Sequence, residues 1–281
     1  MSWHAHFLFY VETSQMTKVC YCADDFSMSP EISSAILDLI EKHRLHATSC
    51  MTQSHLWKSD AQRLMKFSEH IECGLHLNFT HFFDVDTPSF SLPKLMFLAW
   101  SKQLDAAAIR QNIETQWNHF IEATGKTPDF VDGHQHVHQF PVIRDVLVEF
   151  LNQQRFDGWV RNLDHPLSVS PYRLKTFMLR HLGAAQLNRS CQTHHIQQNR
   201  YFAGIYDFKF SNYAALNQQW LRKAQDGLLV MCHPSLLHSN IQDPIHSARV
   251  AEYQYLQSNQ FEQDCHKFNI QRSKIGAILC N

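Results

Sequence analysis

Short apolar segments that end in polar clusters alternate along this chain with segments of helical character. The clusters are Asp-Asp at 24–25, His-Leu-Asn at 76–78, His-Gln-His-Val-His at 134–138, Arg-Asn at 161–162 and Cys-His-Pro-Ser at 232–235. Strands separated by helices predict a mostly parallel sheet, because parallel neighbours need a long crossover connection. The carboxyl ends of such strands converge on one face, where barrels and open parallel sheets build their sites. We therefore predict an α/β protein whose polar clusters lie together.

Local signals place several of the elements. Ser29 precedes Pro30 at the start of an apolar pattern with helical spacing, which predicts a capped helix. A longer helix is predicted over 107–125, with Gly125 as its stop. We expect strands over 129–138 and 275–279, and a loop over 82–95 because prolines and serines interrupt it.

Size and composition narrow the class of protein. The 281 residues suit a single α/β barrel, so one domain over 1–281 is expected, and 44% hydrophobic residues can build a sizeable core. A formal net charge of −1 predicts neither nucleic acid nor an anionic membrane as partner. The chain has no apolar run of membrane-spanning length, and its first residues lack a basic region and a long apolar run, so we expect neither a membrane span nor a secretory signal. Eight cysteines without a C-x-x-C pair are typical of reduced thiols, so we expect a cytoplasmic protein.

Two adjacent carboxylates, Asp24 and Asp25, end the first apolar strand. Neighbouring residues of a strand point to opposite sides, so one carboxylate can bind a metal while the other, reoriented by the turn, accepts a proton. The alternative is a structural pair at a turn or helix start, where aspartate is common.

The histidine run at 134–138 has three imidazoles on alternate positions, two residues after Asp132. In an extended strand all four side chains share one face, but same-face neighbours are roughly 7 Å apart. At most one or two of the histidines can then bind the same small ion. The others would contact substrate, support a ligand or be structural, and a solvated histidine-rich strand end is the alternative for the whole run.

Other histidines are weaker candidates. His76 faces away from the leucines that flank it, and His233 follows an apolar strand, where an acid/base group is one interpretation and a structural histidine the other. The pairs His4/His6 and His194/His195 lie outside convincing strands, and we interpret both pairs as structural.

Taken together, the motifs resemble the YdjC-like carbohydrate deacetylases, a family that includes chitooligosaccharide and hopanoid-pathway deacetylases. The resemblance covers about residues 18–260 and rests on these segments in order: ADDFSMSPEISSAILD, TSCM, GLHLNFT, TPDFVDGHQHVHQFP, VRN and MCHPS. It implies a (β/α) barrel-like fold, often incomplete or distorted. Residues 1–17 have no counterpart, which makes them an expected N-terminal extension. Ser27 and Ser235 stand where the family commonly has glycine.

The resemblance also implies roles for individual residues. Asp25, His76 and His134 match the family's metal ligands, for one divalent ion, Zn²⁺ or Mg²⁺. Asp24 matches the general base, His233 a candidate general acid, and Arg161 a residue that orients substrate or catalytic groups. The implied reaction is metal-dependent removal of the acetyl group from an N-acetylated amino sugar, a small-molecule substrate. Members of the family are often dimeric, which implies a homodimer.

Two other classes of function remain open from the sequence. One is another metal-dependent barrel hydrolase, such as a phosphoesterase or a cyclic amidohydrolase. Those proteins commonly begin with H-x-H after their first strand, whereas acids come first here. The other is a carbohydrate-binding relative without catalysis, which the intact acid pair and histidines disfavour.

Overall fold

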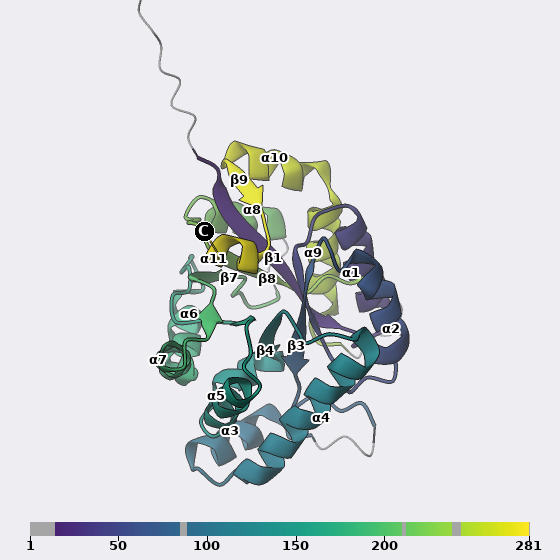
Figure 1. Cartoon of the computed structure of the whole chain (residues 1–281). Coiled ribbons are helices and arrows are strands. Elements are labelled where there is room, and N and C mark those ends of the chain that lie inside the picture. Colours follow the sequence, from purple (N-terminus) through teal and green to yellow (C-terminus); the bar gives the residue numbers. More distant parts are fainter. Residues whose placement is uncertain (1–14, 85–88, 210–211, 238–242, 281) are drawn as a thin grey trace, which may run out of the picture.

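The computed structural model describes residues 15–84, 89–209, 212–237 and 243–280. Most of the expected N-terminal extension, with His4 and His6, lies outside these residues. Figure 1 shows a central curled sheet with helices packed around it. The strands are β1 (Thr17–Phe26), β2 (Ala47–Cys50), β3 (Glu72–Leu77), β4 (Phe130–Gly133), β5 (Trp159–Val160), β6 (Gln197–Gln198), β7 (Tyr201–Ala203), β8 (Leu228–Cys232) and β9 (Ile270–Arg272).

The sheet has the strand order β6-β5-β4-β3-β2-β1-β8-β7, and β9 pairs with β1 outside this path. All of these pairings are parallel. Consecutive strands lie side by side from β1 to β6, so each crossover brings the next carboxyl end to the same edge. The predicted α/β, barrel-like class is confirmed, in the form of an incomplete barrel.

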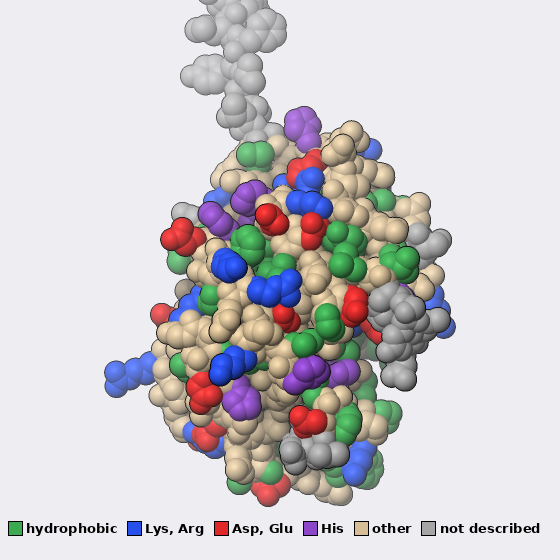
Figure 2. All heavy atoms as spheres, turned by 90° about the vertical axis from the view of Figure 1, so that its right-hand side faces the viewer, with side chains coloured by type: hydrophobic (Ala, Val, Ile, Leu, Met, Phe, Trp, Pro, Cys, Tyr) green, Lys and Arg blue, Asp and Glu red, His purple; other side chains and the backbone are tan. Residues whose placement is uncertain are grey.

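Helices fill the crossovers. They are α1 (Pro30–Glu41), α2 (Trp57–Leu64), α3 (Leu92–Trp100), α4 (Ala106–Thr124), α5 (Ile143–Gln153), α6 (Arg173–Leu179), α7 (Ala185–Thr193), α8 (Tyr213–Leu221), α9 (His246–Gln257), α10 (Asn259–Lys267) and α11 (Ile275–Leu279). Within the described ranges, none of these helices combines the length and the apolarity that a membrane span needs. Acidic, basic and histidine side chains are interspersed on the face in Figure 2, and no single sign of charge dominates it.

The predicted helix ends are found where the sequence signals place them. The Ser29 hydroxyl accepts a hydrogen bond from the Ile32 N–H at 3.3 Å, and Pro30 is the first residue of α1. Gly125 ends α4 in the left-handed conformation, with φ 73°, and its N–H donates to the Ile121 carbonyl. Both caps satisfy backbone groups that the helix itself leaves unpaired.

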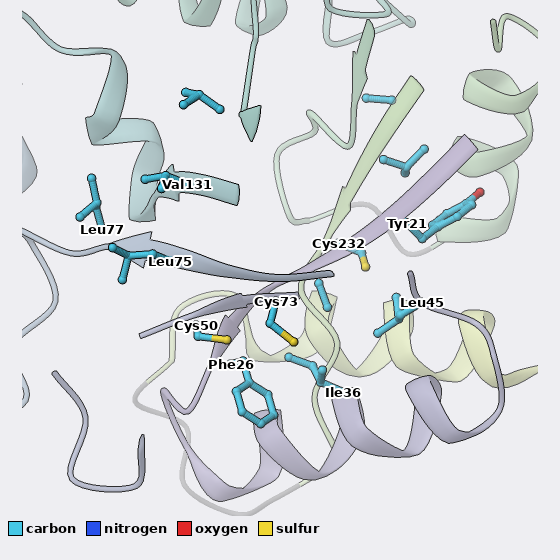
Figure 3. Close-up of a cluster of buried hydrophobic side chains, with 14 of the residues drawn as sticks. Tyr21, Phe26, Ile36, Leu45, Cys50, Cys73, Leu75, Leu77, Val131 and Cys232 are labelled. Atoms are coloured by element: carbon cyan, nitrogen blue, oxygen red, sulfur yellow. The ribbon is translucent and has the colours of Figure 1, made fainter. Parts of the chain in front are cut away.

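The core lies between the sheet and its helices. Figure 3 shows Phe26 and Ile36 beside Cys73 in the layer between the sheet and α1, and all three are fully buried. All eight cysteines are free thiols, and only Cys280 is exposed. Most of the thiols therefore act as small apolar side chains in the core.

Three predicted elements differ from the structure. The strand expected over 129–138 ends at Gly133, the register partner of Leu77, because β3 itself ends there and offers no further pairing. Residues His134–Gln139 form a 3-10 turn, in which Gln135 and His136 have positive φ. Asp132 and the three histidines therefore do not share one strand face.

The segment 275–279 is helix α11 rather than the expected strand. The Glu72 carboxylate accepts the N–H groups of Ile275 at 2.9 Å and Gly276 at 2.7 Å, and so caps the helix from another part of the chain. The loop expected over 82–95 ends earlier, because α3 begins at Leu92 with Pro93 in its first turn.

Candidate functional site

A cavity of about 460 Å³ lies at the carboxyl ends of the strands, and it has the volume of a small-molecule site. Five of the six predicted site residues line it: Asp24, Asp25, His76, His134 and His233. Arg161, the sixth, is fully buried behind the cavity and contacts Asp24. The polar clusters therefore meet as the parallel topology predicts, although Asp24 and His233 are more than two hundred residues apart in the chain.

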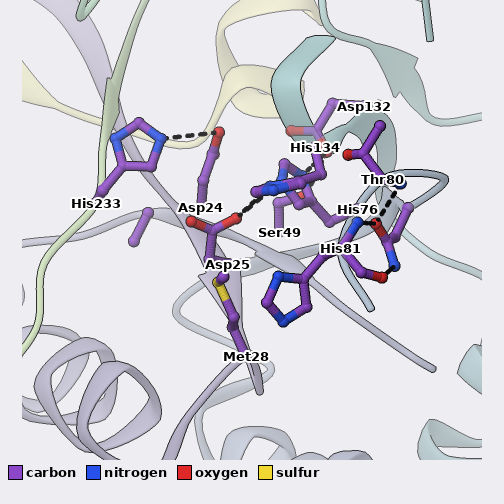
Figure 4. A network of polar contacts seen from close by, with 12 residues as sticks. Asp24, Asp25, Met28, Ser49, His76, Thr80, His81, Asp132, His134 and His233 are labelled. Atoms are coloured by element: carbon purple, nitrogen blue, oxygen red, sulfur yellow. Dashed lines mark hydrogen bonds and ion pairs between the residues drawn. The ribbon is translucent and has the colours of Figure 1, made fainter. Parts of the chain in front are cut away.

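Asp25, His76 and His134 form a compact cluster, whose potential ligand atoms all lie within 4.8 Å of one another. Asp25 Oδ1 is 2.9 Å from His134 Nδ1 and 3.3 Å from His76 Nε2. Asp25 has a positive φ of 68°, which departs from strand geometry where β1 runs into its turn. Ser27 also has a positive φ, 72°, at the position where glycine was the expected residue. Figure 4 shows Asp25 and His134 pointing toward each other.

His76 is oriented by the neighbouring strand. His76 and Asp132 are register partners on β3 and β4, and Asp132 Oδ1 lies 2.6 Å from His76 Nδ1. The Ser49 hydroxyl contacts the same nitrogen at 2.9 Å. A carboxylate on Nδ1 favours the tautomer that carries its proton there, and leaves Nε2 available as a ligand.

The donor set fits a divalent cation. His76 Nε2 is buried without a hydrogen-bond partner among the described residues, and it faces Asp25 and His134. Two imidazole nitrogens and one carboxylate oxygen are common ligands of Zn²⁺, and other divalent ions accept them when water completes the shell. Burial alone would lower the pKa of His76, but Asp132 and Asp25 raise it to about 10. The carboxylates thus favour positive charge at this position.

Arg161 contacts both Asp24 and Asp132, the carboxylate that orients His76. Its guanidinium donates to Asp24 Oδ1 at 2.5 Å and to Asp24 Oδ2 at 2.6 Å. The same group lies 2.6 Å from Asp132 Oδ2. Burial alone would raise the pKa of Asp132, but Arg161 and His76 hold it below its usual range. Arg161 also lies against Asp24, so the same fixed positive charge is close to both carboxylates. One buried guanidinium therefore holds two carboxylates in place.

His233 completes the group on the side of β8. Its Nε2 lies 3.9 Å from Asp24 Oδ2, as the dashed line in Figure 4 marks. Burial lowers the pKa of His233 to about 4, although Asp24 and Asp25 act in the opposite direction. The imidazole is therefore neutral at neutral pH and must gain a proton before it can act as an acid.

The three histidines of the run occupy different positions. His134 belongs to the cluster, and His136 lines the same cavity with its ring edge-on to Phe202. His138 is fully buried, and its Nε2 contacts the Arg161 carbonyl at 3.1 Å. His194 and His195 are exposed at the end of α7, away from the cavity.

Three further residues at the site were not found by sequence reasoning. His81 lines the cavity, and its ring centroid is 6.1 Å from that of His134. Arg249 and Glu252 reach the site from α9. The sequence shows these two charged residues on one face of a predicted helix. Without the fold, that face cannot be told from an ordinary solvent-exposed one.

Comparisons with known proteins agree with the family resemblance. The family model described as YdjC-like protein matches residues 18–267. A chitooligosaccharide deacetylase of Proteus mirabilis (strain HI4320) is 28% identical over 142 residues, which are 47% of this chain and 54% of that protein. A carbohydrate deacetylase of Mus musculus is 29% identical over 142 residues, 46% of this chain and 45% of that protein. These matches span about half the length of each relative.

A longer match and a solved structure extend the comparison. A chitooligosaccharide deacetylase of Serratia marcescens is 24% identical over 234 residues, 78% of this chain and 82% of that protein. A crystal structure from Enterococcus faecalis V583, named for cellobiose-phosphate cleavage, has a TM-score of 0.70 at 15% identity. That alignment covers 94% of this chain and 99% of the other, and it shows a shared fold.

Proposed function

The chain belongs to the YdjC-like protein family, and on that premise we propose that it is a metal-dependent carbohydrate deacetylase. The reaction is hydrolysis of the acetamide of an N-acetylated amino sugar or oligosaccharide, which releases acetate and leaves a free amine. The observation that carries the proposal is the cluster of Asp25, His76 and His134 beside Asp24 and His233 in one cavity. We further propose that the chain is one domain, and that it acts as a homodimer in the cytoplasm.

Asp25, His76 and His134 are the proposed ligands of one divalent ion, Zn²⁺ or Mg²⁺. Such an ion, when bound, supplies Lewis-acid chemistry, which makes water more acidic and polarises the acetyl carbonyl. The support for this ligand set is the buried Nε2 of His76, which makes no hydrogen bond in the described part of the chain and faces Asp25 Oδ1 at 3.3 Å, and the carboxylate behind its Nδ1. Asp132 acts in this account through His76, by orienting its ring.

Asp24 is the proposed general base. Asp24 is 2% exposed, and it lines the same cavity as Asp25 of the ligand cluster. Arg161 holds both oxygens of Asp24 and so restricts its rotation. A carboxylate fixed in this way removes a proton from water without first reorganising, which is the advantage of a positioned base.

His233 is the proposed general acid for the departing amine. Its imidazole is neutral before the reaction, because burial lowers its pKa to about 4. Asp24 Oδ2 lies 3.9 Å from His233 Nε2, so a proton that Asp24 takes from water has a short path to the imidazole. His233 can then donate it to the nitrogen as the C–N bond breaks, and the proton balance closes without an external acid.

The test compares untagged wild-type protein with His134→Ala. We expect the wild type to bind one equivalent of Zn²⁺ and to release acetate from N-acetylglucosamine oligosaccharides, and the variant to lose both properties. His195→Ala is the matched control, because this exposed histidine lies outside the cavity. Full Zn²⁺ occupancy in His134→Ala would overturn the ligand assignment. Sugar binding without turnover, or hydrolysis of phosphoesters without acetate release, would overturn the reaction.

A further inference from the structure

Helix α9 presents two buried charged residues to the site, Arg249 and Glu252. Arg249 is 2% exposed and Glu252 is fully buried. A separation of three residues places both on one side of the helix. Buried charges are rarely retained on a helix face unless each has specific partners, so their contacts are informative.

Arg249 contacts the ligand cluster. Its Nη2 donates to Asp25 Oδ2 at 2.6 Å, and its Nε donates to Asp243 Oδ2 at 2.5 Å. The guanidinium occupies Oδ2, so Oδ1 is the oxygen that faces His76 and His134. Arg249 thus selects which oxygen of Asp25 is offered as a ligand.

Glu252 contacts the opposite end of the site. Its Oε2 accepts the backbone N–H of His233 at 2.5 Å, and its Oε1 accepts the hydroxyl of Tyr206. This hydrogen bond fixes the chain just after β8, where His233 turns toward Asp24. Tyr206 also lines the cavity, so Glu252 joins the cavity wall to the backbone of His233.

We propose, resting on the proposed function, that Arg249 and Glu252 are two separate positioning residues on one helix. Arg249 holds Asp25 with a single oxygen toward the cation, and Glu252 holds His233 in reach of Asp24. Groups that orient metal ligands in this way typically contribute 10–100-fold to metal affinity. The two residues therefore act on different quantities: Arg249 on metal affinity, and Glu252 on the proton-transfer step.

The experiment uses untagged full-length protein and the variants Arg249→Lys, Glu252→Gln and Gln254→Ala. Gln254 is exposed on the same helix and serves as the matched control. Zn²⁺ affinity is measured by competition with a chromophoric chelator, with His134→Ala as the reference for binding outside the cluster. The kcat of acetate release is measured at saturating Zn²⁺, and circular dichroism reports folding.

We expect Arg249→Lys to weaken Zn²⁺ binding by about 10–100-fold, because lysine cannot bridge Asp25 and Asp243 with a planar group. We expect Glu252→Gln to keep Zn²⁺ affinity within about twofold and to lower kcat by at least about tenfold, a part of what a general acid contributes. Asp243→Asn is the second variant, in case Arg249→Lys does not fold. It leaves Asp25 unchanged and weakens the contact between Arg249 and residue 243, so we expect a smaller loss of Zn²⁺ affinity.

Folded Arg249→Lys and Asp243→Asn proteins with wild-type Zn²⁺ affinity would overturn the role of Arg249. A folded Glu252→Gln protein with wild-type kcat would overturn the role of Glu252. Equal loss of both quantities in both variants would mean that α9 supports the fold only. Because Zn²⁺ affinity is read without substrate, a wild type that releases no acetate refutes the proposed function and leaves the test of Arg249 intact.

Discussion

Replacing Glu72 with glutamine should change how the stability of the protein depends on pH. Glu72 is 7% exposed at the start of β3, and its carboxylate accepts the N–H groups of Ile275 and Gly276 at the start of α11. Burial raises its pKa from 4.5 to about 7, although these two N–H groups act in the opposite direction. The folded protein therefore holds a proton on Glu72 at pH values where the unfolded chain has lost it.

The sign and size follow from linkage. A raised pKa in the folded state contributes stability that is fully present below pH 4.5 and is lost as the pH rises through about 7. At about 1.4 kcal/mol per pKa unit, a shift of this size corresponds to about 3 kcal/mol in the free energy of unfolding. Glutamine resembles the protonated acid and cannot ionise, so Glu72→Gln does not lose this stability as the pH rises. Its free energy of unfolding should therefore increase relative to that of the wild type by up to about 3 kcal/mol between pH 4.5 and 8.

Urea unfolding of both proteins at intervals from pH 4.5 to 8 measures this difference. Other titrating groups, such as Glu252 and His46, are common to both proteins, so they cancel in the comparison. A difference in unfolding free energy that stays constant within about 0.5 kcal/mol across this range would refute the account of Glu72. A difference that grows toward acid pH would refute its sign.

Three further predictions concern single contacts. Asp132→Asn should weaken Zn²⁺ binding by about 10–100-fold, because His76 loses a charged partner; chelator competition measures this, and unchanged affinity would contradict the role of Asp132. His233→Ala should lower kcat for acetate release by about 10²–10⁴-fold and leave Zn²⁺ affinity unchanged, so a weaker affinity would place His233 among the ligands. Gly125→Ala should cost about 1–2 kcal/mol in urea unfolding, because φ is 73° and a Cβ meets no atom within 4 Å, so only backbone strain is added. A neutral effect would show that the end of α4 relaxes.

The architecture and the meeting of the polar clusters could be predicted because both follow from local patterns. Apolar runs, helix caps and strand alternation specify parallel strands, and parallel strands bring their carboxyl ends to one edge. Asp24, Asp25, His76 and His233 all lie at strand ends or just after them, so this reasoning reaches them. Their roles in catalysis stay predictions, since no contact in the protein alone measures them.

The differences arise where distant residues decide the local structure. The histidine run leaves the strand because β3 ends opposite Gly133, and α11 forms because Glu72 caps it from β3. Arg249 and Glu252 could not be identified from the sequence, because a charged pair on a helix is usually solvated. It is the packing of α9 against the site that buries them. Each case is a contact between segments far apart in sequence, which a local pattern does not encode.

The most direct measurement of the central claim is acetate release by metal-stripped protein from a panel of N-acetylglucosamine mono- and oligosaccharides. Each reaction is run without metal and with added Zn²⁺, Mg²⁺, Mn²⁺ or Co²⁺. We expect acetate to appear only when a divalent ion is restored, and the most effective ion and sugar then identify the metal and the substrate. Equal release with and without metal would contradict the proposed metal site, and no release with any pair would contradict deacetylation of this class of sugar.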